Sequence, residues 1–136
     1  MSKRKKPLTE VLAAAVEGLL LPSEADHPFE VVEWEHAATA LATAASFKKL
    51  VGAPAKARAE SLDAEKFLAP HCADREGLDD EGKAMAAKYR ALREVLHAEL
   101  HDLRVFRIGA LRITTYLVGR LGSGDVVGLK ALQNET

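Results

Sequence analysis

Residues 104–132 read RVFRIGALRITTYLVGRLGSGDVVGLKAL and hold the clearest strand pattern of the chain. Residues 104–109 and 111–120 predict two strands. Glycines 109, 122 and 124 favour tight turns at the two junctions. The middle strand has Leu111, Ile113, Thr115 and Leu117 on one face and Arg112, Thr114, Tyr116 and Val118 on the other. The stretch therefore predicts an antiparallel meander that VVGLKAL closes.

Two helix patterns precede the meander. Residues 80–100 repeat apolar side chains every three or four positions, and the acidic residues 79–81 suit the positive end of this helix. Residues 8–20 form a second apolar stripe, in which Gly18 weakens the last turn and Pro22 stops the helix. The apolar positions of the longer helix are Met85, Tyr89, Leu92, Leu96 and Leu100.

The segments between these patterns are shorter. Residues 29–35 alternate as a strand, so Trp34 is expected to be largely protected. Residues 39–51 predict a helix that ends at Gly52, with Leu41, Ala45 and Leu50 facing inward. Residues 55–61 predict an edge strand, 62–68 one or two turns of helix, and 69–82 a surface loop.

Length and composition indicate one globular domain. The chain has 136 residues, of which 48% are hydrophobic and 29% charged. We expect residues 1–7 to form a flexible basic tail and residues 8–136 to form the domain. Strands mixed with helices predict an α/β fold of the α+β kind, with a mostly antiparallel sheet and helices packed on it.

Charge and cysteine content limit the cellular setting. The formal net charge is −1, and without Lys3, Arg4, Lys5 and Lys6 it is −5, so the folded body is mildly acidic. Neither a secretory signal nor a run of about 20 apolar residues is expected, which argues against a membrane protein. A single cysteine, Cys72, permits a reducing compartment. We expect a cytoplasmic monomer.

Several polar groups can be weighed as catalytic or metal sites. His97 and His101 have the i, i+4 spacing of a metal-binding helix, but no third ligand lies nearby in the sequence. Cys72 follows His71 in a polar stretch, where an ordinary exposed thiol is expected. Neither a nucleophile-elbow pattern around Ser23 nor a phosphate-binding glycine loop is present. The sequence therefore predicts a protein that is not an enzyme and has no cofactor.

Two separated blocks of the chain resemble the nuclease A inhibitor family. Residues 18–35, GLLLPSEADHPFEVVEWE, contain an acidic loop between a helix and a strand, and residues 89–136 cover the second block. Members of that family bind and block a sugar-non-specific DNA/RNA endonuclease. The resemblance implies an α/β/α sandwich of the PR-1-like type and a nuclease as protein partner, with no direct contact to nucleic acid.

The resemblance also implies which residues bind the partner. Glu24 matches a loop glutamate that contacts the nuclease, and Thr136 matches a terminal threonine that reaches the nuclease's catalytic metal. Glu135 adds a carboxylate beside Thr136. Hard divalent cations prefer oxygen ligands, so such groups are suited to occupy a nuclease site.

The chain departs from the family at one position of the expected interface. The family carries an exposed tryptophan in the loop before its long helix, and this sequence has Gly77 there, followed by Leu78, which partly substitutes. Loss of an aromatic anchor weakens or redirects binding. Two alternatives therefore stay open: a non-catalytic protein-binding module of the same fold with a different partner, and, ranked last, an enzyme that uses a metal at His97 and His101.

Overall fold

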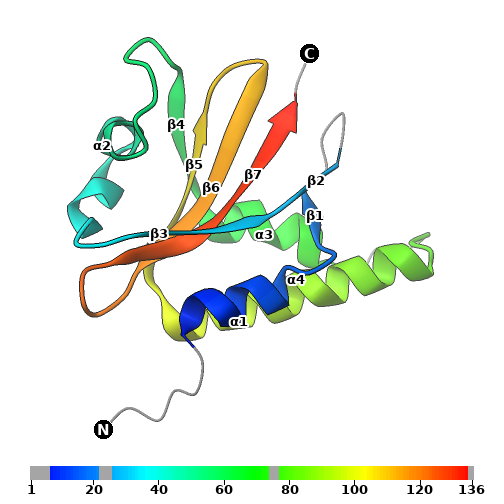
Figure 1. Ribbon diagram of the computed structural model, residues 1–136. Coiled ribbons are helices and arrows are strands. Elements are labelled where there is room, and N and C mark those ends of the chain that lie inside the picture. The colour runs from blue at the N-terminus through cyan, green and yellow to red at the C-terminus, as the bar shows by residue number, and fades with distance from the viewer. Residues whose placement is uncertain (1–6, 22–25, 74–76, 135–136) are drawn as a thin grey trace, which may run out of the picture.

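A computed structural model describes residues 7–21, 26–73 and 77–134 of the chain. The elements run in the order shown in Figure 1. Their bounds are α1 Leu8–Ala15, β1 Leu20–Leu21, β2 His27–Pro28, β3 Glu30–Trp34, the 3-10 helix η1 Ala38–Ala42, α2 Ala44–Leu50, β4 Ala59–Asp63, α3 Ala64–Cys72, α4 Asp80–Glu99, β5 His101–Ile108, β6 Arg112–Arg120 and β7 Val126–Asn134.

The predicted meander is confirmed and forms the centre of the fold. Within the described ranges, five strands pair antiparallel in the order β3-β7-β6-β5-β4, and β1 pairs with β2 in a separate ribbon. Tyr116 in the middle of β6 lies opposite Phe106 of β5 and Lys130 of β7. The strands β3 and β4 therefore form the two edges of the larger sheet.

Gly109 makes the first hairpin turn possible. Its φ is +119°, in a region that residues with side chains rarely adopt. A Cβ built at this position would lie 2.2 Å from the carbonyl oxygen of Arg112. The turn between β5 and β6 therefore requires glycine for both backbone conformation and space.

Helices cover both faces of the sheet (Figure 1). Side chains of α1, α3 and α4 pack with Val105, Leu117 and Leu129 on one face. The segment η1–α2 covers part of the other face. There the Phe47 ring stacks on Phe106 with centroids 4.4 Å apart. The sequence-based expectation of an antiparallel sheet with packed helices is confirmed.

The alternation predicted for the first long strand is also confirmed. Phe29 and Val31 belong to the core with α1 and α4, whereas Val32 and Trp34 pack on the α2 side. Trp34 is half-buried and meets the Phe47 ring edge-on, with centroids 5.6 Å apart.

Two predicted helices are corrected at their ends. The first stops at Ala15 rather than Leu20, because Gly18 adopts a φ of +76° and the chain then enters β1. The predicted helix 39–51 divides at Thr43, whose hydroxyl accepts a hydrogen bond from the Ser46 backbone N–H. Because α2 starts anew after this cap, it buries Phe47 and leaves Ala45 exposed, contrary to prediction.

The region between β3 and the long helix was predicted least accurately. The edge strand is β4 at 59–63, which begins four residues later than predicted and ends two residues later. The following helix α3 runs through 69–72, which were predicted to be loop. Asp63 caps α3 by accepting from the backbone N–H groups of Glu65 and Lys66. Leu68 and Cys72 are buried on one side, so packing maintains the helix despite Pro70.

The long helix α4 agrees with the prediction to within one residue at its C-terminal end. It buries Tyr89, Leu92 and Leu96 against the sheet, as its periodicity indicated. Asp79 caps it by accepting from the Gly82 N–H at 2.7 Å, which confirms the helix-start role of these acidic residues. None of the described helices is long and apolar enough to cross a membrane.

Candidate interaction surface

The predicted partner-binding residues fall into two groups. Glu24, Glu135 and Thr136 lie outside the described residues. Gly77 and Leu78 are described, at the start of the α4 helix. The described residues next to 22–25 and 135–136 show where the acidic loop and the C-terminal tail leave the folded core.

The acidic loop leaves from the β1–β2 ribbon. Leu21 lies opposite His27 in the antiparallel register, so the two ends of segment 22–26 start from paired positions. Leu21 is fully buried, which anchors the ribbon in the core. The Tyr89 hydroxyl donates a hydrogen bond of 2.6 Å to the Leu20 carbonyl oxygen and joins the ribbon to α4. Burial raises the pKa of Tyr89 well above its ordinary value, so the hydroxyl remains a donor.

The C-terminal strand ends beside the same ribbon. Asn134 is the last residue of β7, and its Nδ2 lies 3.4 Å from Nε2 of His27. On its other side Asn134 lies opposite Arg112 of β6. The end of β7 and the β1–β2 ribbon point to the same side of the molecule (Figure 1). The fold therefore brings together the starting points of two segments that are 107 residues apart in the sequence.

The Gly77 position is a left-handed turn. Gly77 is exposed and has a φ of +87°, with open space around a Cβ built there. The backbone conformation, rather than crowding, favours glycine at this position. A tryptophan at 77 would therefore be strained.

Leu78 lies next to a small hollow between α3 and α4. The hollow has a volume of about 150 Å³, and its lining includes Leu78, His71 and Tyr89. The His71 ring stacks on Tyr89 with centroids 4.7 Å apart. Tyr89 thus contacts both the wall of this hollow and, through Leu20, the β1–β2 ribbon. Among the described residues, no hydrogen bond joins Gly77 or Leu78 directly to the ribbon.

Charge is distributed unevenly along the chain. Residues 7–47 contain no lysine or arginine. Their carboxylates are Glu10, Glu17, Glu24, Asp26, Glu30, Glu33 and Glu35. Asp26, Glu30, Glu33 and Glu35 are all exposed along the ribbon and the β3 edge. The chain's small net charge therefore conceals an acidic edge, which a window-by-window charge count of the sequence would have found.

A comparison with protein families decides the family. The family described as "Nuclease A inhibitor-like protein" matches residues 6–136, nearly the whole chain. The chain belongs to the nuclease A inhibitor-like family. No curated protein sequence matched it. Membership confirms the resemblance noted in the sequence and indicates a nuclease as the protein partner.

His97 and His101 do not have the geometry that a metal-binding pair on one helix requires. The helix α4 ends at Glu99, so His101 lies in β5 rather than one helical turn from His97. The His97 ring nitrogen Nε2 lies 2.9 Å from a carboxylate oxygen of Glu65. Among the residues that the structure describes, no group of three or more histidine, cysteine or acidic side chains could hold a metal ion.

The expectation of an exposed loop thiol is wrong. Cys72 lies in the last turn of α3 and is buried, with 5% of its surface exposed. Burial raises the pKa of the Cys72 thiol, with smaller opposing effects from Arg93 and Arg90. A neutral, buried thiol is a poor nucleophile. In this nuclease A inhibitor-like protein Cys72 serves as a core residue.

Sequence reasoning missed the residues that support the surface. Tyr89, His27 and Asn134 position the ribbon and the end of β7, yet only Tyr89 stood out, as one apolar position of a helix. The contact of His27 with Asn134 depends on how distant strands pair, which local patterns do not encode.

Proposed function

We propose that this protein inhibits a metal-dependent, non-specific DNA/RNA endonuclease by blocking its active site. Family membership supports a nuclease as the target. The observation that carries the mechanism is the contact of His27 with Asn134, because it starts the acidic loop and the C-terminal tail from neighbouring points. Two segments with such origins can enter one cleft of a partner together.

The chemistry of the blocking groups follows from what a nuclease site binds. Such a site holds a hard divalent cation and basic groups arranged for phosphate. The Thr136 hydroxyl supplies an oxygen ligand for the partner's metal, and the Glu135 carboxylate adds negative charge. Glu24 pairs with an arginine of the nuclease, because charge-assisted pairs of this kind are strong. The inhibitor itself performs no catalysis and carries no cofactor.

The acidic edge supports this assignment. Asp26 and Glu30 continue the negative charge from the ribbon onto β3, with no lysine or arginine between them. Complementary charge accelerates the encounter with a basic partner and excludes wrong ones. We further propose that the protein acts as a cytoplasmic monomer, with one domain over 8–136 behind a basic tail at 1–7. Helices on both faces of the sheet support an α/β/α sandwich of the PR-1-like type.

The decisive experiment measures inhibition of the non-specific nuclease encoded by the same organism. Deleting Glu135 and Thr136 should sharply reduce inhibition while the melting temperature stays unchanged. Glu24→Ala should weaken binding by about 2 to 5 kcal/mol if it leaves a buried arginine unpaired. Glu94→Ala, which removes an exposed carboxylate on α4, is the matched control and should inhibit normally. Equal inhibition by all four proteins would contradict the proposed mechanism.

A binding module with a different partner is the second candidate. It is favoured by Gly77, because a φ of +87° does not suit the tryptophan that the family carries there. A pull-down with the full chain distinguishes the two. Recovery of a non-nuclease protein, together with an absence of nuclease inhibition, would support the module and exclude the inhibitor.

A further inference from the structure

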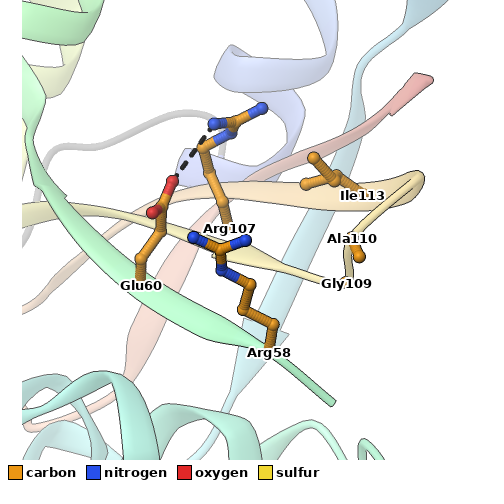
Figure 2. A pocket seen from close by; sticks show the side chains of 6 residues that line it. All are labelled: Arg58, Glu60, Arg107, Gly109, Ala110 and Ile113. Atoms are coloured by element: carbon orange, nitrogen blue, oxygen red, sulfur yellow. Dashed lines mark hydrogen bonds and ion pairs between the residues drawn. The ribbon is translucent and has the colours of Figure 1, made fainter. Parts of the chain in front are cut away.

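A polar hollow lies at the β4 edge of the sheet, away from the β1–β2 ribbon. Its volume is about 220 Å³, and Figure 2 shows the side chains around it. The lining residues are Arg58, Glu60, Arg107, Gly109, Ala110 and Ile113. Because β4 pairs with β5 and is the last strand on this side, the hollow opens at an edge that a ligand can reach.

Two guanidinium groups face this hollow. The Arg107 Nη1 donates to Oε1 of Glu60 at 3.1 Å, and Arg107 is largely covered, with 20% of its side chain exposed. Arg58 extends toward the same space from the residue just before β4 (Figure 2). Within the described ranges, no carboxylate forms an ion pair with Arg58. Arginine stays charged at all ordinary pH values, so the three charged groups sum to one positive charge.

The backbone keeps the hollow open. The Gly109 N–H donates to the Arg58 carbonyl oxygen at 2.8 Å and holds the start of β4 against the β5–β6 turn. Gly109 has no side chain to fill the space, and its conformation excludes one. Ala110 and Ile113 give part of the wall an apolar surface. The site therefore combines the exposed cation of Arg58, the cation of Arg107 held by Glu60, and an apolar side.

We propose that this hollow binds the carboxylate group of a small ligand. A planar guanidinium presents parallel N–H donors that match a carboxylate in bidentate geometry. One negative charge neutralises the local excess of one positive charge, whereas a phosphate dianion would exceed it and would be repelled by Glu60 more strongly than a carboxylate. The apolar wall at Ile113 contacts the carbon stem of the carboxylate. This proposal does not depend on nuclease inhibition.

A titration followed by amide NMR tests the site. Acetate added to the full-length protein at constant ionic strength, set with chloride, should shift the Gly109 and Ala110 amides with a dissociation constant in the millimolar range. Arg58→Gln should weaken this binding at least about 10-fold. Lys56→Gln removes the same charge from an exposed residue that does not line the hollow, and it should bind acetate as the wild type does.

Three results would overturn the proposal. The first is the absence of saturable shifts at Gly109 and Ala110 in the wild-type protein. The second is equal weakening by Arg58→Gln and Lys56→Gln, which would indicate general charge attraction. The third is tighter binding of inorganic phosphate than of acetate, which would assign the hollow to phosphate. Unchanged melting temperatures of both variants establish that any loss is local, since both side chains are exposed.

Discussion

The two edges of the sheet differ in charge. The β3 edge has Glu30, Glu33 and Glu35 exposed, in a segment without a lysine or arginine. At the β4 edge, Arg58 precedes the strand, and Arg107 of the neighbouring strand β5 pairs with Glu60. The strand β4 also carries the exposed carboxylate of Asp63. A net charge of −1 suggests weak steering toward any partner, but this average combines two different surfaces. A partner that approaches one edge interacts mainly with the charges of that edge, because salt screens interactions beyond about 8 to 10 Å.

The two edges also differ in how they are held. The β1–β2 ribbon beside β3 is fixed to α4 by a side-chain hydrogen bond from Tyr89. The start of β4 is fixed by the backbone, through the Gly109 N–H in the β5–β6 turn. Side-chain and backbone supports predict different sensitivities to substitution.

The largest expected loss of stability comes from the backbone support of the β4 edge. Gly109→Ala should lower the free energy of unfolding by about 2 to 3 kcal/mol, because alanine is strained at a φ of +119° and collides with Arg112. Urea denaturation measures the loss. Gly122→Ala is the control, since its added Cβ meets nothing within 4 Å, and it should change stability by less than about 0.5 kcal/mol. Equal effects would show that the turn does not constrain this edge.

An aromatic side chain introduced in the loop before α4 should have the next largest effect, on nuclease binding. Leu78→Trp should tighten nuclease binding about 10-fold, since residue 78 has no left-handed constraint and large aromatic side chains dominate interfaces. Gly77→Trp should instead lower the free energy of unfolding by about 1 to 2 kcal/mol, because φ there is +87°. Calorimetry and urea denaturation measure the two effects. No gain from Leu78→Trp would remove this loop from the interface.

The side-chain support of the ribbon should contribute less. Tyr89→Phe removes the donor to Leu20 and should cost about 1 kcal/mol of unfolding free energy. Tyr116→Phe is the control, because the Tyr116 hydroxyl makes no hydrogen bond with the described residues. Amide exchange at Leu20 and Leu21 should accelerate in Tyr89→Phe, while exchange in β4 should stay unchanged. Faster amide exchange both in the β1–β2 ribbon and in β4 would contradict the inference that the two edges are held independently.

The same tyrosine gives stability a pH dependence. The pKa of Tyr89 is raised by burial, so above about pH 10 the unfolded chain loses the proton and the folded chain retains it. The contribution of protonated Tyr89 to the free energy of unfolding is fully present below about pH 10 and is lost as the pH rises further. Tyr89→Phe should show a smaller alkaline loss of stability than the wild type.

Surface charge should have the smallest effect on stability and a selective effect on rate. Glu33→Gln with Glu35→Gln should change the free energy of unfolding by less than about 0.5 kcal/mol. At low salt the pair should slow association with a basic nuclease about threefold, and high salt should abolish the difference. Arg58→Gln, on the opposite edge, should not slow association. Stopped-flow mixing measures these rates, and equal slowing by both changes would show that the edges do not act separately.

Long, regular patterns explain why much of the fold was predictable. The strands of the meander run over eight or nine residues with turn glycines between them, and α4 repeats its apolar stripe over 20 residues, so both give long signals in the sequence. The ribbon strands have two residues each, which is too short for any period. The last turn of α3, residues 69–72, was missed because Pro70 signals a break, whereas burial of Leu68 and Cys72 maintains the helix.

The candidate surface was predictable in a different sense. Glu24, Glu135 and Thr136 came from family resemblance, since a short acidic loop and a polar terminus have no distinctive pattern of their own. Their neighbourhood depends on β7 ending beside His27, and that pairing joins distant segments. The Arg58 hollow likewise needs three strands and a turn to assemble. Local sequence patterns predict individual helices and strands, whereas these two sites depend on how distant strands pair.

Pairing between distant strands also sets an order for folding. The strands β5, β6 and β7 follow one another through short turns, so their hairpins can form early. The strand β3 pairs along its whole length with β7, from Glu30 with Lys130 to Trp34 with Val126, and therefore waits for the last strand of the sheet. Closing that long loop is slow compared with closing a hairpin. Trp34, the single tryptophan, should report this late step, so its fluorescence should change after the meander's amides are protected from exchange.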